Sequence, residues 1–111
     1  MDLDFQHSFK DCVNKIGEIG EAYAEAKGQS WQAQELKGAL LASLMKAQGQ
    51  IPVSKAEVMA KSSEDYRQHI KETSALITKE LKLKCQYEKE KARFEAYRSL
   101  SSLEKATRNI T

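Results

Sequence analysis

The sequence predicts an all-α protein, built as a long antiparallel helical hairpin of the coiled-coil type. Apolar residues recur at steps of three and four along most of the chain. This spacing averages 3.5 residues and keeps one apolar stripe facing a partner helix. The single proline lies near the middle of the chain, close to a glycine, and these two residues mark the point where the chain reverses.

The chain of 111 residues has the length of one domain. We therefore expect a single helical-hairpin domain over residues 1–111. Its first arm covers about residues 3–48, its turn residues 49–53 and its second arm about residues 54–108. Arms of similar length that are joined by a short loop favour antiparallel packing.

A regular heptad seam opens the first arm. Its members are Phe5, Phe9, Cys12, Ile16, Ile19, Tyr23 and Ala26. Gly17 and Gly20 lie within this stretch, and each lowers the stability of the helix by about 1 kcal/mol relative to alanine. Two interpretations stay open: a neighbouring backbone approaches closely at these glycines, or the helix tolerates them.

The pattern is interrupted at Gly28-Gln29-Ser30, because glycine can end a helix and serine can cap the next one. We expect a kink or a break there, after which a helical stripe continues to about Gln48. Trp31 opens this segment. We expect it to pack across the hairpin, since large aromatic side chains supply much of a small core. The alternative is that Trp31 anchors a partner.

The turn lies at Gly49-Gln50-Ile51-Pro52-Val53, where glycine ends one helix and proline disfavours helical dihedrals in the residue before it. The next residues read as a capping box, with Ser54 as the N-cap and Glu57 at the third helical position. A second helix start follows at Ser62-Ser63-Glu64-Asp65. Residues 55–61 are therefore expected to form a short helix that bends into a longer one.

The second arm has no glycine or proline after about Ser63. Its expected seam comprises Tyr66, Ile70, Thr73, Ile77, Leu81 and Cys85, continued by Ala92, Ala96, Leu100 and Leu103. A second stripe comprises Leu76, Leu83, Tyr87, Phe94 and Tyr97. We expect its part through Leu83, Tyr87, Phe94 and Tyr97 to lack cover within the chain, because charged residues interrupt the apolar positions there.

Self-association is expected, because only 41% of the residues are apolar and a thin core leaves its stripes partly exposed. A two-fold dimer is the default, and a helical bundle is its expected form. We assign the oligomer or partner interface to the N-terminal seam, since charged residues interrupt the stretch 76–97 that should lie opposite. The interface residues are Phe5, Phe9, Cys12, Ile16, Ile19 and Tyr23.

The net charge of +2 does not by itself indicate nucleic-acid binding. The densest basic stretch contains Lys79, Lys82, Lys84, Lys89, Lys91, Arg93 and Arg98, which are the candidate nucleic-acid contacts. Lysines and arginines can meet phosphates while nearby aromatic rings stack on bases. Glutamates are interleaved at helical pairing distances, for example Glu80 with Lys84, and a solvated face of ion pairs is the favoured interpretation.

No pattern in the sequence indicates an enzyme, a cofactor site or a metal site. Cys12 and Cys85 show no paired spacing, and His7 and His69 have no metal-ligand motif around them. The glycines form no phosphate-binding loop. We expect a cytoplasmic protein without a membrane span. The triplet Asn109-Ile110-Thr111 matches a glycosylation site, and we expect this match to be due to chance.

Several strings in the chain resemble a set of small helical proteins of tailed bacteriophages and prophages, often encoded among early or recombination genes. These strings are Gln34-Glu35-Leu36-Lys37, Pro52-Val53-Ser54-Lys55-Ala56-Glu57, Ala60-Lys61-Ser62-Ser63, Glu64-Asp65-Tyr66, Ala92-Arg93-Phe94-Glu95-Ala96-Tyr97-Arg98-Ser99-Leu100 and Ser101-Ser102-Leu103-Glu104-Lys105. The resemblance covers about residues 30–105. It implies a phage or prophage origin and an accessory role, and it implies no reaction.

Our first hypothesis is a non-enzymatic phage or prophage accessory protein in the bacterial host cytoplasm. Its helices would bind a phage or host protein and a second copy of the chain. The alternative is a nucleic-acid-binding accessory factor of phage recombination or replication.

Overall fold

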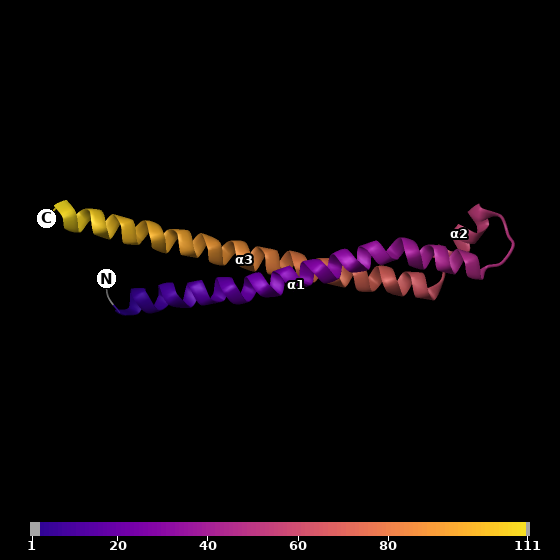
Figure 1. Cartoon of the computed structure of the whole chain (residues 1–111), viewed down its shortest axis with the longest axis horizontal. Helices are drawn as coiled ribbons and strands as arrows, with labels where there is room; N and C mark the ends of the chain where they lie inside the picture. The colour runs from indigo at the N-terminus through magenta and orange to yellow at the C-terminus, as the bar shows by residue number, and fades with distance from the viewer. Residues whose placement is uncertain (1–2, 111) are drawn as a thin grey trace. The chain divides into compact units, whose positions relative to one another are not determined.

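The computed structural model describes residues 3–110. Their helices are α1 (Leu3–Ala47), α2 (Val53–Lys61) and α3 (Glu64–Ile110), and the described residues include no strand (Figure 1). This confirms the predicted all-α helical hairpin. The chain divides into two units, which we describe separately: unit 1 joins residues 3–24 to 81–110, and unit 2 covers residues 25–80. A single domain over residues 1–111 stays a prediction.

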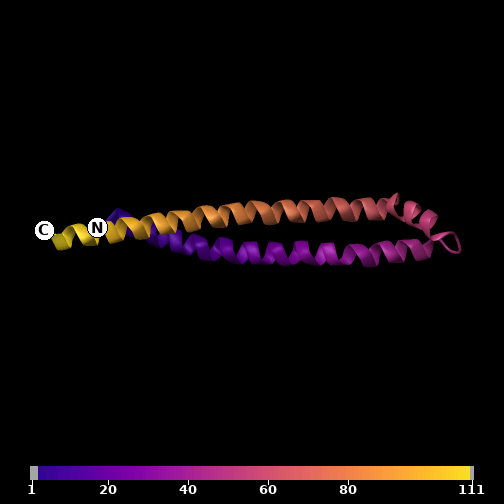
Figure 2. The ribbon, with the colours of Figure 1, turned by 90° about the horizontal axis from the view of Figure 1, so that it is seen from above.

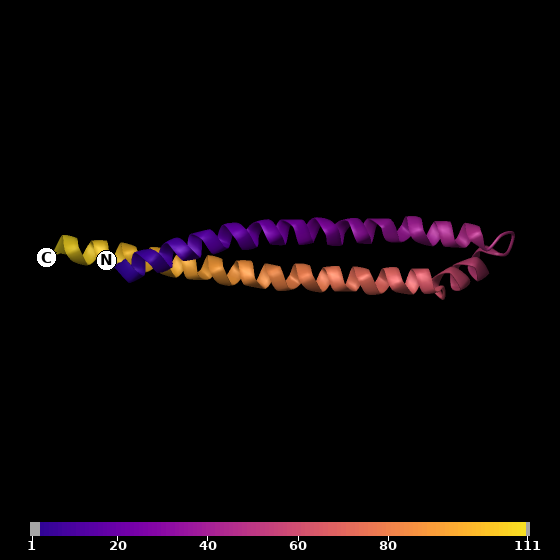
Figure 3. The ribbon, with the colours of Figure 1, turned by 90° about the horizontal axis from the view of Figure 1, so that it is seen from below.

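In unit 1, the start of α1 lies beside the end of α3 (Figure 3). Phe5 contacts Tyr97 with a ring-centroid separation of 5.3 Å, and Tyr23 contacts Tyr87 at 6.0 Å. Residue numbers therefore rise along one helix as they fall along the other, so the two stretches are antiparallel. Cys12 lies between these aromatic contacts and is fully buried.

In unit 2, the chain reverses in the loop after α1, and α2 lies between this loop and α3 (Figure 2). Gly49 has a φ of +81°, a conformation that favours glycine. Its N–H donates to the Lys46 carbonyl at 3.2 Å and closes the end of α1. The glycine therefore ends the helix at the place that the sequence indicates.

The predicted N-cap at Ser54 is wrong. Pro52 holds the cap position, α2 begins at Val53, and no side chain caps this helix. The Ala56 N–H donates to the Pro52 carbonyl at 3.0 Å, so Ser54 already lies inside the first turn. Glu57 instead pairs with Lys61, four residues on, at 2.8 Å.

The second predicted helix start is confirmed. A short helix, α2, ends at Lys61, and α3 begins at Glu64. The Ser63 hydroxyl accepts a hydrogen bond from the Tyr66 N–H at 3.2 Å and donates one to the Ala60 carbonyl at 2.6 Å. Ser63 therefore caps α3 and fixes the bend between the two helices.

We expected a kink or a break at Gly28-Gln29-Ser30, and the break is wrong, because α1 continues as one helix through these residues. The kink stays a prediction. Ser30 is fully buried, and its hydroxyl accepts a hydrogen bond from Gln34 Nε2 at 3.0 Å. It follows Ala26 by four residues and therefore continues the heptad seam. A glycine inside a helix costs only about 1 kcal/mol, which the packing on either side can offset.

The expected seam of α3 is correct only in its first part. Tyr66 and Thr73 are buried, and Ile70 and Ile77 are half-buried. Beyond Ile77 the expected members are exposed: Leu81, Cys85, Ala92, Ala96, Leu100 and Leu103. The side facing α1 instead carries the second stripe, because Tyr66, Thr73, Tyr87 and Phe94 continue one seven-residue repeat.

Candidate interaction surface

The N-terminal seam packs on aromatic rings of α3 inside unit 1. Phe9 lies 5.4 Å from Phe94 and 6.0 Å from Tyr97, measured between ring centroids. The expectation that Tyr87, Phe94 and Tyr97 lack cover within the chain is therefore wrong.

The six residues assigned to the oligomer interface are all buried or half-buried in this chain: Phe5, Phe9, Cys12, Ile16, Ile19 and Tyr23. Their contact with a second copy stays a prediction. Because these side chains are largely covered within the chain, the exposed residues offer more area to a partner.

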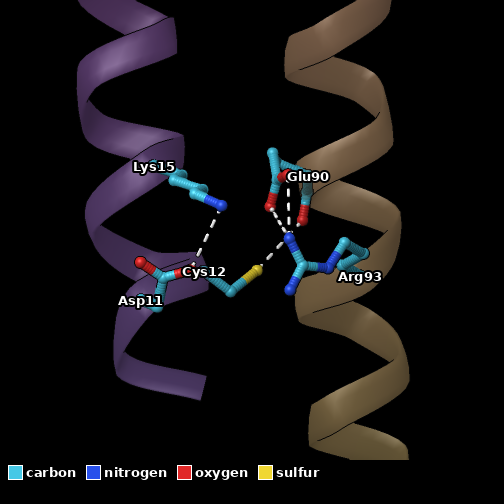
Figure 4. A network of polar contacts seen from close by, with 5 residues as sticks. All are labelled: Asp11, Cys12, Lys15, Glu90 and Arg93. Carbon is cyan, nitrogen blue, oxygen red and sulfur yellow. Dashed lines mark hydrogen bonds and ion pairs between the residues drawn. The ribbon is translucent and has the colours of Figure 1, made fainter. Parts of the chain in front are cut away.

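A polar pair interrupts the aromatic contacts of unit 1 (Figure 4). Glu90 is only 8% exposed, and both of its carboxylate oxygens accept hydrogen bonds from Arg93 Nη1 at 2.9 Å. The Cys12 thiol donates to the Glu90 backbone carbonyl at 3.4 Å. Burial raises the pKa of the Cys12 thiol, and a thiol held in its protonated form is a poor nucleophile.

Three rows of exposed residues run along α3 in unit 1, and we call these rows the outer face. The middle row is Cys85, Ala92 and Ser99, the acidic row is Leu81, Glu88 and Glu95, and the basic row is Lys82, Lys89, Ala96 and Leu103. Members of a row are seven residues apart, so they lie on one line along the helix. Five of these residues belong to the seam that the sequence predicts for the second arm: Leu81, Cys85, Ala92, Ala96 and Leu103.

The predicted basic stretch does not present its aromatic rings for stacking. Lys79 lies in unit 2 and the other six residues lie in unit 1. Lys91 Nζ lies 5.4 Å from the Tyr87 ring centroid, and the Arg98 guanidinium lies 6.0 Å from that of Phe94. The rings that could stack on bases therefore already contact α1 and cations of the same helix, and nucleic-acid contact at this stretch stays a prediction.

His69 makes a contact between helices in unit 2 that the sequence did not indicate. Its Nε2 donates to the Ala33 carbonyl at 2.9 Å, because a carbonyl oxygen can only accept. Thr73, one turn further on, is buried, and its hydroxyl has no partner within residues 3–110. Together with Leu36 and Leu76, they line an open groove of about 340 Å³.

Trp31 is 64% exposed, so the expectation that it packs across the hairpin is wrong. The preceding residue, Ser30, takes the buried position of this helical turn. Trp31 therefore lies on the exposed side of the helix. The alternative interpretation, in which Trp31 anchors a partner, stays a prediction.

The described part of the chain contains no group of three or more His, Cys, Asp or Glu side chains placed to hold a metal ion. None of the helices within residues 3–110 is long and apolar enough to cross a membrane. Cys12 and Cys85 are both free thiols. Comparison with protein-family models, curated proteins and solved structures finds no match to this chain.

Proposed function

We propose that this chain is a non-enzymatic accessory protein that acts through contacts between helices, both with a protein partner and with a second copy of itself. One observation carries this proposal: three leucine side chains are exposed along the part of α3 that belongs to unit 1. Leu81, Leu100 and Leu103 are 52%, 53% and 64% exposed. Burying a fully exposed leucine side chain contributes about 1.5–3 kcal/mol. These leucines are already partly covered and would each contribute a part of that, so three on one helix favour association.

The phage or prophage origin and the cytoplasmic location are parts of the same proposal. They rest on the strings of residues that resemble small phage-encoded helical proteins. A short helical protein that offers side chains for association suits an accessory role, because it can link or block other proteins without catalysing a reaction.

Sedimentation equilibrium from low to tens of micromolar concentration tests the self-association. We expect a reversible rise in mass with concentration. The variant Leu103→Asp should lower this rise and keep the helical content, because Leu103 is exposed within the chain. The matched variant Leu83→Asp should lose helical content, because Leu83 is half-buried and lies one heptad before the buried Glu90. A wild-type protein that stays monomeric throughout contradicts the self-association.

A second candidate function is nucleic-acid binding as an accessory factor of phage recombination or replication. Three exposed lysines favour it: Lys82, Lys84 and Lys89 have no ion-pair partner in the described part of the chain. Binding of a fluorescent single-stranded oligonucleotide should then weaken steeply as salt rises, and Lys84→Ser should reduce this dependence. Affinity that does not change with salt contradicts this function.

A further inference from the structure

We propose that a second copy of this chain binds along the outer face of α3, parallel and in register, so that the acidic row of each copy faces the basic row of the other. This inference rests on the proposed self-association and specifies its surface and its orientation.

The middle row makes close approach of two helices possible. Cys85, Ala92 and Ser99 have small side chains, and all three are exposed. Because no bulky group projects from this row, two copies of α3 can approach each other along it. Leu81 on one side and Leu103 on the other are exposed, and they supply apolar area at the two ends of the contact.

The charges beside the middle row select the orientation. Glu88 and Glu95 lie on one side of it, and Lys82 and Lys89 lie on the other. A two-fold axis parallel to the helices places the acidic row of each copy against the basic row of its partner. An antiparallel pair would place each row against its own copy, glutamate against glutamate and lysine against lysine. Like charges facing each other at an interface disfavour association, so this pattern favours the parallel pair.

Contacts within the chain leave these charges available. Glu95 pairs with Arg98 at 3.4 Å, but both side chains are more than 60% exposed. An ion pair this open to water contributes little and can exchange for a pair across the interface. Glu88, Lys82 and Lys89 make no ion pair within residues 3–110.

The parallel arrangement places the two copies of Cys85 at the same height in the middle row. Mild oxidation should then join them in a disulfide: the two thiols lose two protons and two electrons, which diamide accepts. Cys12 does not compete, because it is buried and its thiol pKa is raised. An antiparallel pair centred on Ala92 would instead place Cys85 opposite Ser99 of the other copy.

The first experiment treats the reduced full chain with diamide at a concentration where sedimentation shows a dimer. We expect a covalent dimer from the wild type and from Cys12→Ser, and none from Cys85→Ser. The variant Cys85→Ser/Ser99→Cys should form it again, because residue 99 lies in the same row two heptads further on. If a cross-link forms only in a variant that has cysteine at both position 85 and position 99, the parallel register is overturned.

The second experiment reverses the charges of one row at a time. The variants Glu88→Lys/Glu95→Lys and Lys82→Glu/Lys89→Glu should each weaken dimerisation by about tenfold or more, because two rows of one sign then face each other. Mixing the two variants should restore the dimer, because every facing pair again has opposite signs. All four residues are exposed, so helical content should stay unchanged, and circular dichroism checks this.

The outcomes separate this inference from the function on which it rests. Cross-linking through Cys85, together with a dimer restored in the mixture, supports the parallel pair. A dimer that neither forms the Cys85 cross-link nor responds to charge reversal overturns the parallel pair and leaves self-association through another surface. A protein that is monomeric at every concentration overturns both.

Discussion

Unit 1 and unit 2 join α1 to α3 with different kinds of side chain. In unit 1 the contact is made largely by aromatic rings, such as Phe9 on Phe94. In unit 2 the buried residues include small ones, such as Ser30 and Ala60, and a histidine donates a hydrogen bond to the opposite helix. The same heptad spacing thus supports both a contact dominated by apolar area and one in which individual polar bonds matter.

The largest expected effect comes from removing a ring in unit 1. Phe9→Ala should lower the free energy of unfolding by about 3 kcal/mol, the lower end of the range for such changes, because Phe9 is only half-buried. The urea midpoint measures this loss. Trp31→Ala is the control, since an exposed aromatic residue should change stability by less than about 0.5 kcal/mol. Equal losses in the two variants would contradict the ring contact.

Removal of the bond between helices in unit 2 should cost less. His69→Ala should lower the free energy of unfolding by about 1.5 kcal/mol, because it removes a hydrogen bond and some packing in the groove. Gln68→Ala is the matched control, since its bond to Glu72 lies on the exposed side of α3. If both variants unfold at the same urea concentration, His69 does not hold the helices together.

The cap of α3 comes next in size. Ser63→Ala should lower the free energy of unfolding by about 1 kcal/mol, because the Tyr66 N–H loses its acceptor. Ser54→Ala should leave stability unchanged or raise it slightly, since Ser54 lies within the first turn and caps nothing. A larger loss from Ser54→Ala than from Ser63→Ala would reverse the assignment of the two helix starts.

The smallest expected change is a gain. Gly17→Ala should raise the free energy of unfolding by about 0.5–1 kcal/mol, because no atom beyond the neighbouring helix backbone lies within 4 Å of the added Cβ. Gly20→Ala should gain less, since its Cβ would lie 3.3 Å from the Tyr87 ring, which must shift. Thermal melts of the two variants measure the difference. A smaller gain at Gly17 than at Gly20 would contradict this account of the ring.

The glycine environments also answer the question that the sequence left open. No neighbouring backbone approaches a Cβ built at Gly17, and the close neighbour of Gly20 is a tyrosine ring. Helix propensity alone could not separate these two cases, because the difference lies in a residue of the opposite helix.

The sequence predicted the fold class, the reversal near Gly49 and the short helix before α3, because their signals are local. It failed on the second half of α3, where two stripes are similarly apolar. The stripe with Tyr87 and Phe94 also carries Glu90, and a charged residue is rarely buried unless it is paired. That glutamate is buried because Arg93, one turn away, satisfies its carboxylate. The repeat of large aromatics every seven residues was the signal that favoured this stripe.

The same error explains why the outer face was missed. Leu81, Cys85, Ala92, Ala96 and Leu103 were recognised as an apolar stripe but assigned to the core. The side chains of the opposite arm determine which of the two stripes of α3 faces it. Because α1 carries aromatic residues, the stripe of α3 that contains aromatic residues packs against it. Pairing across a hairpin is a long-range property that the periodicity of one helix does not determine.

The contact between Cys12 and Glu90 also limits how the two arms can be misaligned during folding. If one arm slid along the other by a heptad, Glu90 would lie opposite Phe5 or Ile19 instead of Cys12. Both side chains are larger than cysteine, and the carboxylate would have to be accommodated against a bulky apolar group. A hairpin in the wrong register therefore lacks the space that the small thiol provides. This one position disfavours misaligned hairpins, which a uniformly apolar seam would allow.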